Sequence, residues 1–242
     1  SFPTRRSSDL RILFRDSGDG TLVLTLQTLP DNRYFAIAPD LYVRQGDVSR
    51  LADIEDSLRG TRFVVVPGMA ATYALGVDSM NWRFLAERLH AGDAVYDIGG
   101  NCGQMALFFS HSVGAAGRVY SFEPVPQNAA TLRRNLALNA CGNVEVIEAA
   151  VAADAQSQTF CFDSGNHTMG TLEGAMVKLA VWDTTFQVAC VTLDGMIAQG
   201  ARPPQVLKID VEGAGLGVIQ GGGELIERHR PSIYFELHAD DR

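Results

Sequence analysis

V-Y-D-I-G-G-N-C-G, at residues 95–103, predicts an apolar strand that runs into a glycine-rich turn. The strand is expected at Ala94–Ile98, and a helix is expected at Gln104–Ser112. Glycine lets the backbone approach a ligand closely, and a helix N-terminus offers free N–H groups. In an open parallel sheet, ligands bind beyond the carboxyl ends of the strands. We therefore predict a ligand site at this turn, formed by Gly99, Gly100, Asn101 and Gly103.

The acid just before this turn, Asp97, indicates what kind of ligand binds there. Dinucleotide sites use the pattern G-x-G-x-x-G, with a pyrophosphate at the helix N-terminus, and the glycine pattern here differs. A carboxylate at this position would repel a pyrophosphate but attract a cation. The amino-acid end of S-adenosylmethionine, with its ammonium and nearby sulfonium, is such a ligand. The alternative is that Asp97 is a turn or cap residue, because Asp is common in turns.

A second acid ends the next expected strand, Arg118–Phe122. Glu123, followed by Pro124, stands about twenty residues after the glycine turn, where an acid accepts hydrogen bonds from ribose hydroxyls. This feature is common to NAD and S-adenosylmethionine sites, so it predicts a nucleoside without choosing between the two. The alternative is a solvated strand-end acid. Ala149 and Ala150, after a third expected strand at Val144–Ile147, are candidates to contact an adenine.

The third element is L-K-I-D-V-E-G, at residues 207–213. The period of two in a strand puts Lys208, Asp210 and Glu212 on one face. Charges in a buried strand are costly unless they are paired, so we expect Lys208 to pair with Asp210 or with another acid near the strand's carboxyl end. A structural ion pair is the alternative to a catalytic role. His167, in the polar loop 163–168, is a further candidate base, although an ordinary loop histidine is the more common case.

Around these motifs the chain alternates short apolar strands with helices, which predicts a doubly wound, mostly parallel α/β sheet covered on both faces. The remaining expected elements, in chain order, are a helix at Trp82–Leu89, a helix at Gln127–Asn139 with Pro126 in its first turn, strands and loops at 156–190, a strand at Gln205–Val211, a helix to about His229, and a strand at Ser232–Leu237. Trp182 and Phe186 are expected to pack in the core or cap rather than to hold a cofactor.

The motifs together resemble the FkbM family of S-adenosylmethionine-dependent methyltransferases from about Trp82 to Glu236. The resemblance rests on D-I-G-G-N-C-G at 97–103, S-F-E-P-V-P-Q-N at 121–128, L-R-R-N-L-A-L-N at 132–139, V-T-L-D at 191–194, L-K-I-D-V-E-G-A at 207–214 and R-P-S-I-Y-F-E at 230–236. The resemblance implies a class I methyltransferase fold, which is Rossmann-like. It also implies an enzyme of a family that often methylates hydroxyls of sugars or natural products. The family usually has Ala at the position of Gly100 and Glu at that of Gly215.

We therefore expect O-methylation of a sugar or small natural-product hydroxyl, with S-adenosylmethionine as cofactor. An alcohol is a poor nucleophile, so a general base should assist. Asp210 is the first candidate for this base, and Glu212 and His167 are the next candidates. Lys208 is expected to position Asp210 or the substrate. Two other functions stay open: an NAD-dependent oxidoreductase, and a binding domain that keeps the nucleoside pocket without turnover.

The two ends of the chain differ from the rest. Residues 1–10, S-F-P-T-R-R-S-S-D-L, match one reading frame of a common sequencing-adapter oligonucleotide, so we expect them to be an artefact. Residues 11–80 predict a small β-rich cap, with strands at 11–14, 21–27, 34–38 and 62–66 and a short helix at 51–58. Residues 81–242 are the expected methyltransferase domain. We expect it to be truncated, because class I methyltransferases carry two further strands after the fifth.

Composition limits the partners. The net charge is −8, and no Lys/Arg run exceeds two residues, which argues against a nucleic-acid partner. No apolar stretch approaches the roughly 20 residues of a membrane helix. The four cysteines form no C-x-x-C pair, and we expect them to be reduced in a cytoplasmic protein. His238, Asp240 and Asp241 are expected to be solvated, and no metal site is predicted.

Overall fold

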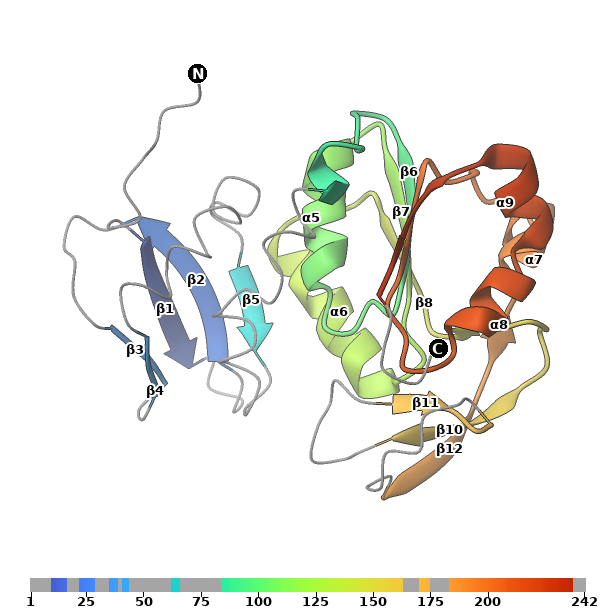
Figure 1. Ribbon diagram of the computed structural model, residues 1–242. Coiled ribbons are helices and arrows are strands. Elements are labelled where there is room, and N and C mark those ends of the chain that lie inside the picture. The colour runs from blue at the N-terminus through green and yellow to red at the C-terminus, as the bar shows by residue number, and fades with distance from the viewer. Residues whose placement is uncertain are drawn as a thin grey trace. The chain divides into compact units, whose positions relative to one another are not determined.

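The computed structural model describes residues 84–162, 170–174 and 183–236, together with five N-terminal strands (Figure 1). These strands are β1 (Leu10–Asp16), β2 (Leu22–Thr28), β3 (Phe35–Ala38), β4 (Leu41–Val43) and β5 (Arg62–Val65). β1, β2 and β5 form one antiparallel sheet, and β3 pairs with β4. The strands expected from the sequence in this region are confirmed. The helix expected at Leu51–Leu58 lies outside the described residues.

The chain divides into two compact units, and the second, which begins at Arg88, contains a five-stranded parallel sheet. Its strands are β6 (Ala94–Ile98), β7 (Arg118–Phe122), β8 (Val144–Ile147), β14 (Val206–Ile209) and β15 (Ser232–Phe235). The order across the sheet is β15-β14-β6-β7-β8. Every residue of β6 and of β14 is buried, as expected for central strands covered on both faces.

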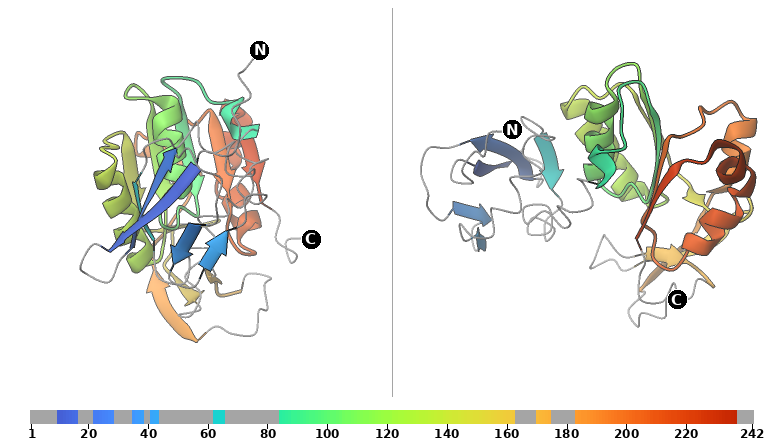
Figure 2. Two further views of the ribbon diagram at one scale, coloured as in Figure 1. Left: turned by 90° about the vertical axis from the view of Figure 1, so that its left-hand side faces the viewer. Right: turned by 45° about the horizontal axis from the view of Figure 1, so that its top comes forward.

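Helices cover both faces of this sheet, so the unit has three layers (Figures 1 and 2). One face carries α5 (Gln104–Val113) and α6 (Pro126–Leu138), and the other carries α7 (Leu193–Ala198), α8 (Gly215–Gln220) and α9 (Gly223–His229). The core between the sheet and the second helical layer includes Tyr96, Phe122, Leu207 and Val218. The doubly wound α/β fold is confirmed, and β15 lies at one edge of the sheet.

The helix expected to run to His229 is in fact two short helices, so that prediction is wrong in one respect. The chain turns at Gly221 and Gly222, which are both buried. A Cβ on Gly221 would lie 2.1 Å from the backbone carbonyl oxygen of Ala152, and one on Gly222 would lie 2.8 Å from the Leu193 side chain. Close packing therefore requires glycine at both positions, and glycine is a poor helix former. Of the helix expected at Trp82–Leu89, residues 84–86 are helical, residues 87–89 are not, and residues 82 and 83 lie outside the described part of the chain.

A second, smaller sheet follows β8. It is antiparallel, with the order β11-β10-β12, and consists of β10 (Gln158–Phe162), β11 (Gly170–Leu172) and β12 (Thr184–Val188). β9 (Ala150–Val151) and β13 (Cys190–Val191) pair in parallel and connect it to the rest of the unit. Phe186 packs against its apolar cluster, as expected, whereas Trp182 lies outside the described residues. Within the described part of the chain, none of the helices has the length and apolar character of a membrane span.

Candidate functional site

The glycine turn between β6 and α5 is shaped by close packing. Gly99 has φ +83°, and a Cβ there would lie 2.0 Å from the backbone oxygen of Asp210. A Cβ on Gly100 would lie 2.2 Å from the Ser121 hydroxyl, and Gly103, with φ +92°, packs against Leu132. These glycines therefore let the turn approach β14, β7 and α6. Only Gly99 and Asn101 of the four predicted turn residues also line the adjoining pocket.

The backbone N–H groups of this turn are used inside the protein. Gly99 and Gly100 both donate to the carbonyl of Phe122, at 3.1 and 2.9 Å. Asn101 donates to Glu123 Oε2 at 2.8 Å. The N–H of Cys102 donates to the side chain of its neighbour Asn101, and that of Gly103 donates to the carbonyl of Gly100. The N–H groups of residues 99–103 are therefore engaged within the protein.

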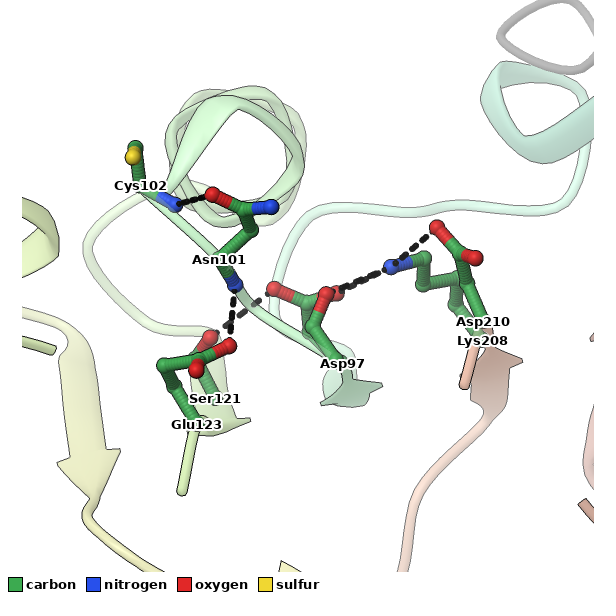
Figure 3. A network of polar contacts seen from close by, with 8 residues as sticks. Asp97, Asn101, Cys102, Ser121, Glu123, Lys208 and Asp210 are labelled. Atoms are coloured by element: carbon green, nitrogen blue, oxygen red, sulfur yellow. Dashed lines mark hydrogen bonds and ion pairs between the residues drawn. The ribbon is translucent and has the colours of Figure 1, made fainter. Parts of the chain in front are cut away.

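A buried charge network lies beneath the turn (Figure 3). Lys208 Nζ lies 3.3 Å from Asp97 Oδ1 and 3.2 Å from Asp210 Oδ2, and it donates to the carbonyl of Gly99 at 2.9 Å. Asp97 Oδ2 also accepts a hydrogen bond from the Ser121 hydroxyl at 2.9 Å. The pairing of Lys208 with Asp210 that the sequence predicted is confirmed, and Asp97 joins it. The side chains of Asp97 and Lys208 are buried, whereas that of Asp210 is 37% exposed.

Burial and charge act against each other in this network. Burial raises the pKa of Asp97 above its ordinary range, and the ammonium of Lys208 opposes that shift. Burial alone would lower the pKa of Lys208, but the carboxylates of Asp210 and Asp97 outweigh it, and the pKa is raised. Lys208 is therefore held in its charged form, and it connects a buried acid to one that faces the pocket.

Glu123, at the end of β7, is buried and almost fully paired. Its Oε2 accepts from the N–H of Asn101, and its Oε1 accepts from the N–H of Val125 at 2.9 Å and from the amide of Asn128 at 3.4 Å. Burial raises the pKa of Glu123 to about 7, although the N–H groups of Val125 and Asn101 favour the charged form. The same carboxylate thus shapes the glycine turn and faces the pocket.

A pocket lies beyond the carboxyl ends of the parallel strands, between these strand ends and the antiparallel sheet. Its volume is about 110 Å³. Of the predicted site residues, it is lined by Gly99, Asn101, Glu123, Pro124, Ala149, Ala150, Asp210 and Glu212. Asp97, Gly100, Gly103 and Lys208 are not among its lining residues, and His167 lies outside the described part of the chain.

The far wall of the pocket was not predicted from the sequence. It comes from β10 and β11, and its residues are Phe160, Phe162, Gly170, Thr171 and Leu172. The alternation F-C-F at 160–162 signals a strand with one apolar face, but nothing in it indicates that this face covers a pocket. The Thr171 hydroxyl donates to the carbonyl of Glu212 and so connects the antiparallel sheet to the loop after β14.

The residues around this pocket suit the nucleoside part of S-adenosylmethionine. Glu123 presents a carboxylate, a group that commonly accepts hydrogen bonds from ribose hydroxyls, and most of the other lining residues are small or apolar. Within the described residues, no cluster of three or more His, Cys, Asp or Glu side chains could hold a metal ion.

Comparison with known proteins agrees with this geometry. Residues 97–241 match the model of the methyltransferase FkbM domain. None of the curated proteins matches the sequence. The solved structures that are similar include the methyltransferase FkbM from Methylobacillus flagellatus KT (14% identity, 78% of this chain and 48% of that chain, TM-score 0.41). They also include an rRNA methylase from Streptococcus thermophilus (14% identity, 62% and 63%, TM-score 0.36).

A SAM-dependent O-methyltransferase from Thermotoga maritima is also similar (16% identity, 60% and 57%, TM-score 0.31). This chain spans less than two thirds of the length of each of these three proteins. The family match covers more than half of the chain and includes the glycine turn, Glu123 and the Lys208–Asp210 pair. The chain belongs to the FkbM methyltransferase family, whose cofactor is S-adenosylmethionine.

Proposed function

We propose that this chain transfers a methyl group to a hydroxyl of a small-molecule acceptor, such as a sugar or a natural product. S-adenosylmethionine supplies the electrophilic methyl group when it is bound. The observation that carries the proposal is the position of Asp210, a partly exposed carboxylate at the pocket, which is held by the buried ammonium of Lys208. A fixed carboxylate can orient a hydroxyl and accept its proton as charge develops.

The other residues are assigned by their contacts. Glu123 binds the ribose, and Gly99, Asn101 and Pro124 form the pocket wall beside it. Ala149 and Ala150 line the same pocket, and we assign them to the contact with the adenine. Asp97, Gly100, Gly103 and Lys208 act as positioning residues, because they shape the turn and hold Asp210 without lining the pocket. Glu212 lines the same pocket and is the second candidate base.

Two features favour this function over a dinucleotide-dependent one. A pyrophosphate needs free N–H groups at the turn, and those of residues 99–103 are engaged. The carboxylates of Glu123, Asp210 and Glu212 also line the pocket, and they would repel a pyrophosphate but attract a sulfonium. Calorimetry with S-adenosylhomocysteine and with NADH separates the two functions, and only the first ligand is expected to bind.

The pocket is smaller than the roughly 300–1,000 Å³ of typical small-molecule sites, at about 110 Å³. We therefore expect side chains of the pocket wall to move outward when the whole cofactor binds. Phe160 and Phe162 are the bulky groups on that wall. We expect hydrogen exchange in β10 and β11 to change when S-adenosylhomocysteine binds.

The test of turnover is a radiolabelled methyl-transfer screen over sugars and glycosylated metabolites. Asp210→Asn should lower turnover by about 10²–10⁴-fold, with S-adenosylhomocysteine affinity little changed. Asp154→Asn, an exposed acid that does not line the pocket, is the matched control. Near-normal turnover in Asp210→Asn, with a large loss in Glu212→Gln, would move the base to Glu212. Cofactor binding with no methyl transfer to any acceptor would favour a binding domain without turnover.

A further inference from the structure

A second cleft lies beside the pocket, between α8 and the end of β11. Its volume is about 440 Å³, within the range of typical small-molecule sites. The two cavities share Leu172 and Ala214 in their walls. Residues 210–212 line the first cavity, and Gly213 lines the second. The cleft therefore adjoins the pocket along the loop that carries both candidate bases.

The walls of this cleft are mainly apolar. Leu216 is 66% exposed there, and Ile219 and Phe235 stand in the same wall. An exposed Leu beside two partly buried apolar side chains offers a surface on which an apolar group can pack. The polar side chains of the cleft are Gln158, Glu173 and Gln220.

Charge narrows the class of ligand further. The charged residues among the described lining residues of the two cavities are all acids: Glu123, Asp210, Glu212 and Glu173. No Lys, Arg or His from the described part of the chain lines either cavity. A phosphorylated acceptor or an RNA strand would meet only like charge there, whereas phosphate recognition depends on clustered positive charge.

Glycine keeps the cleft open along α8. A Cβ on Gly217 would have its nearest neighbour, the backbone nitrogen of Ala153, at 3.6 Å. A larger side chain at this position is therefore sterically allowed at its Cβ, and it would take up volume in the cleft. Gly223, at the start of α9, has no atom within 4 Å of such a Cβ and does not line the cleft.

We propose, on the basis of the methyl transfer proposed above, that this cleft binds the apolar arm of an uncharged acceptor. The acceptor is then an alcohol joined to an alkyl chain or an aromatic ring. Its hydroxyl lies at Asp210 and Glu212, and its apolar arm lies over α8 against Leu216 and Phe235. The acceptor class is an amphiphilic alcohol rather than a free or phosphorylated sugar.

Three probes with one sugar headgroup test the proposal: n-octyl β-D-glucoside below its micellar concentration, methyl β-D-glucoside and glucose 6-phosphate. Ligand-observed NMR measures their binding to the full chain, with and without S-adenosylhomocysteine. The octyl glucoside is expected to bind at least about tenfold more tightly than the methyl glucoside, because burial of each methylene contributes favourably. Glucose 6-phosphate is expected to bind no better than the methyl glucoside.

Two variants assign the binding to the cleft. Gly217→Leu fills the cleft, and Leu216→Asp places a charge on its apolar wall. Each should weaken octyl glucoside binding at least about fivefold and leave S-adenosylhomocysteine affinity within about twofold. Gly223→Leu is the matched control and should change neither. Because Leu216 is exposed, Leu216→Asp keeps the test valid if Gly217→Leu fails to fold.

Equal binding of the octyl and methyl glucosides, no binding of either, or undiminished octyl binding in Leu216→Asp would overturn the cleft proposal. The proposed function fails in a different measurement, because it requires calorimetric binding of S-adenosylhomocysteine by the unmodified chain. If the chain binds S-adenosylhomocysteine but does not prefer the octyl glucoside, the proposed methyl transfer stands and the proposed role of the cleft is rejected.

Discussion

Lys208 and Asp97 lie directly opposite each other on the neighbouring parallel strands β14 and β6, and their side chains form a buried ion pair. Ser121 stands opposite Asp97 on the next strand, β7, and donates a hydrogen bond to it. Three central strands are thus joined by a row of polar side chains inside an apolar sheet. The row ends at Asp210, so the packing of the core and the position of a pocket acid depend on the same ammonium group.

Removal of that ammonium should be strongly destabilising. Lys208→Met leaves Asp97 buried without its cation, and loss of one partner of a buried pair typically costs about 3–5 kcal/mol. Urea denaturation measures this change in the free energy of unfolding. Arg133→Met, which removes the exposed pair with Glu148, is the control and should cost less than about 1 kcal/mol. A double variant that adds Asp97→Asn should recover part of the loss, and no recovery would argue against a direct coupling of the two side chains.

Gly99 should tolerate no side chain. Gly99→Ala places a Cβ at 2.0 Å from the backbone oxygen of Asp210 and also requires a left-handed φ for an L residue. Gly200→Ala also has a left-handed φ, +94°, with open space around it, so it reports the backbone strain alone, roughly 1–2 kcal/mol. We expect Gly99→Ala to lower the melting temperature well beyond this control and to abolish binding of S-adenosylhomocysteine. Similar melting temperatures for the two variants would contradict the close approach to Asp210.

Gly215 makes room for an aromatic ring. A Cβ there would lie 2.1 Å from the Phe235 ring. Gly215→Ala should therefore destabilise the protein, although Ala is the better helix former by about 1 kcal/mol. Combination with Phe235→Ala should remove this penalty, as a double-mutant cycle of unfolding free energies would show. A stabilising effect of Gly215→Ala alone would mean that helix propensity decides at this position.

Cofactor binding should depend on pH through Glu123. The charged carboxylate is the form that accepts hydrogen bonds from two ribose hydroxyls, and burial raises its pKa to about 7. Calorimetric affinity for S-adenosylhomocysteine should therefore increase from pH 6 to pH 8. Glu123→Gln should bind more weakly and lose most of this dependence. An unchanged pH profile in Glu123→Gln would assign the dependence to another group.

The raised pKa of Glu123 also predicts how the free energy of unfolding changes with pH. Without ligand, the folded protein holds the Glu123 proton more tightly than the unfolded chain does, because the pKa is raised from 4.5 to about 7. The contribution of this proton to stability is complete below pH 4.5 and is lost as the pH rises through 7. The free energy of unfolding should therefore fall more steeply over this range in the unmodified chain than in Glu123→Gln.

The parallel core could be predicted well from the sequence, because its signals are local. β6 and β8 begin and end as expected, α5 differs from the prediction by one residue at its end, and α6 differs by one residue at each end. The period of two in β14 also predicted that Lys208 and Asp210 would meet. These elements carry strong apolar runs with turn residues beside them, and tertiary contacts do not override them.

Long-range contacts explain what the sequence could not show. Nothing near Asp97 indicates that its cation would come from residue 208. The helix break at Gly221 depends on the carbonyl of Ala152, which is remote in the sequence. Phe160 and Phe162 were visible as strand residues, but only the fold places them over a pocket.

The antiparallel sheet also has a kinetic consequence. On one side of the pocket, the glycine turn is fixed by hydrogen bonds and by the charged row of the parallel sheet. On the other side stand two short strands, fastened to the loop after β14 by the Thr171 hydroxyl. We expect S-adenosylhomocysteine to leave the pocket past β10 and β11, because fewer contacts hold that wall in place. The turnover rate would then depend on how often the hydrogen bond between Thr171 and Glu212 breaks. Thr171→Val should therefore increase the dissociation rate of S-adenosylhomocysteine and leave the Asp97–Lys208 ion pair intact.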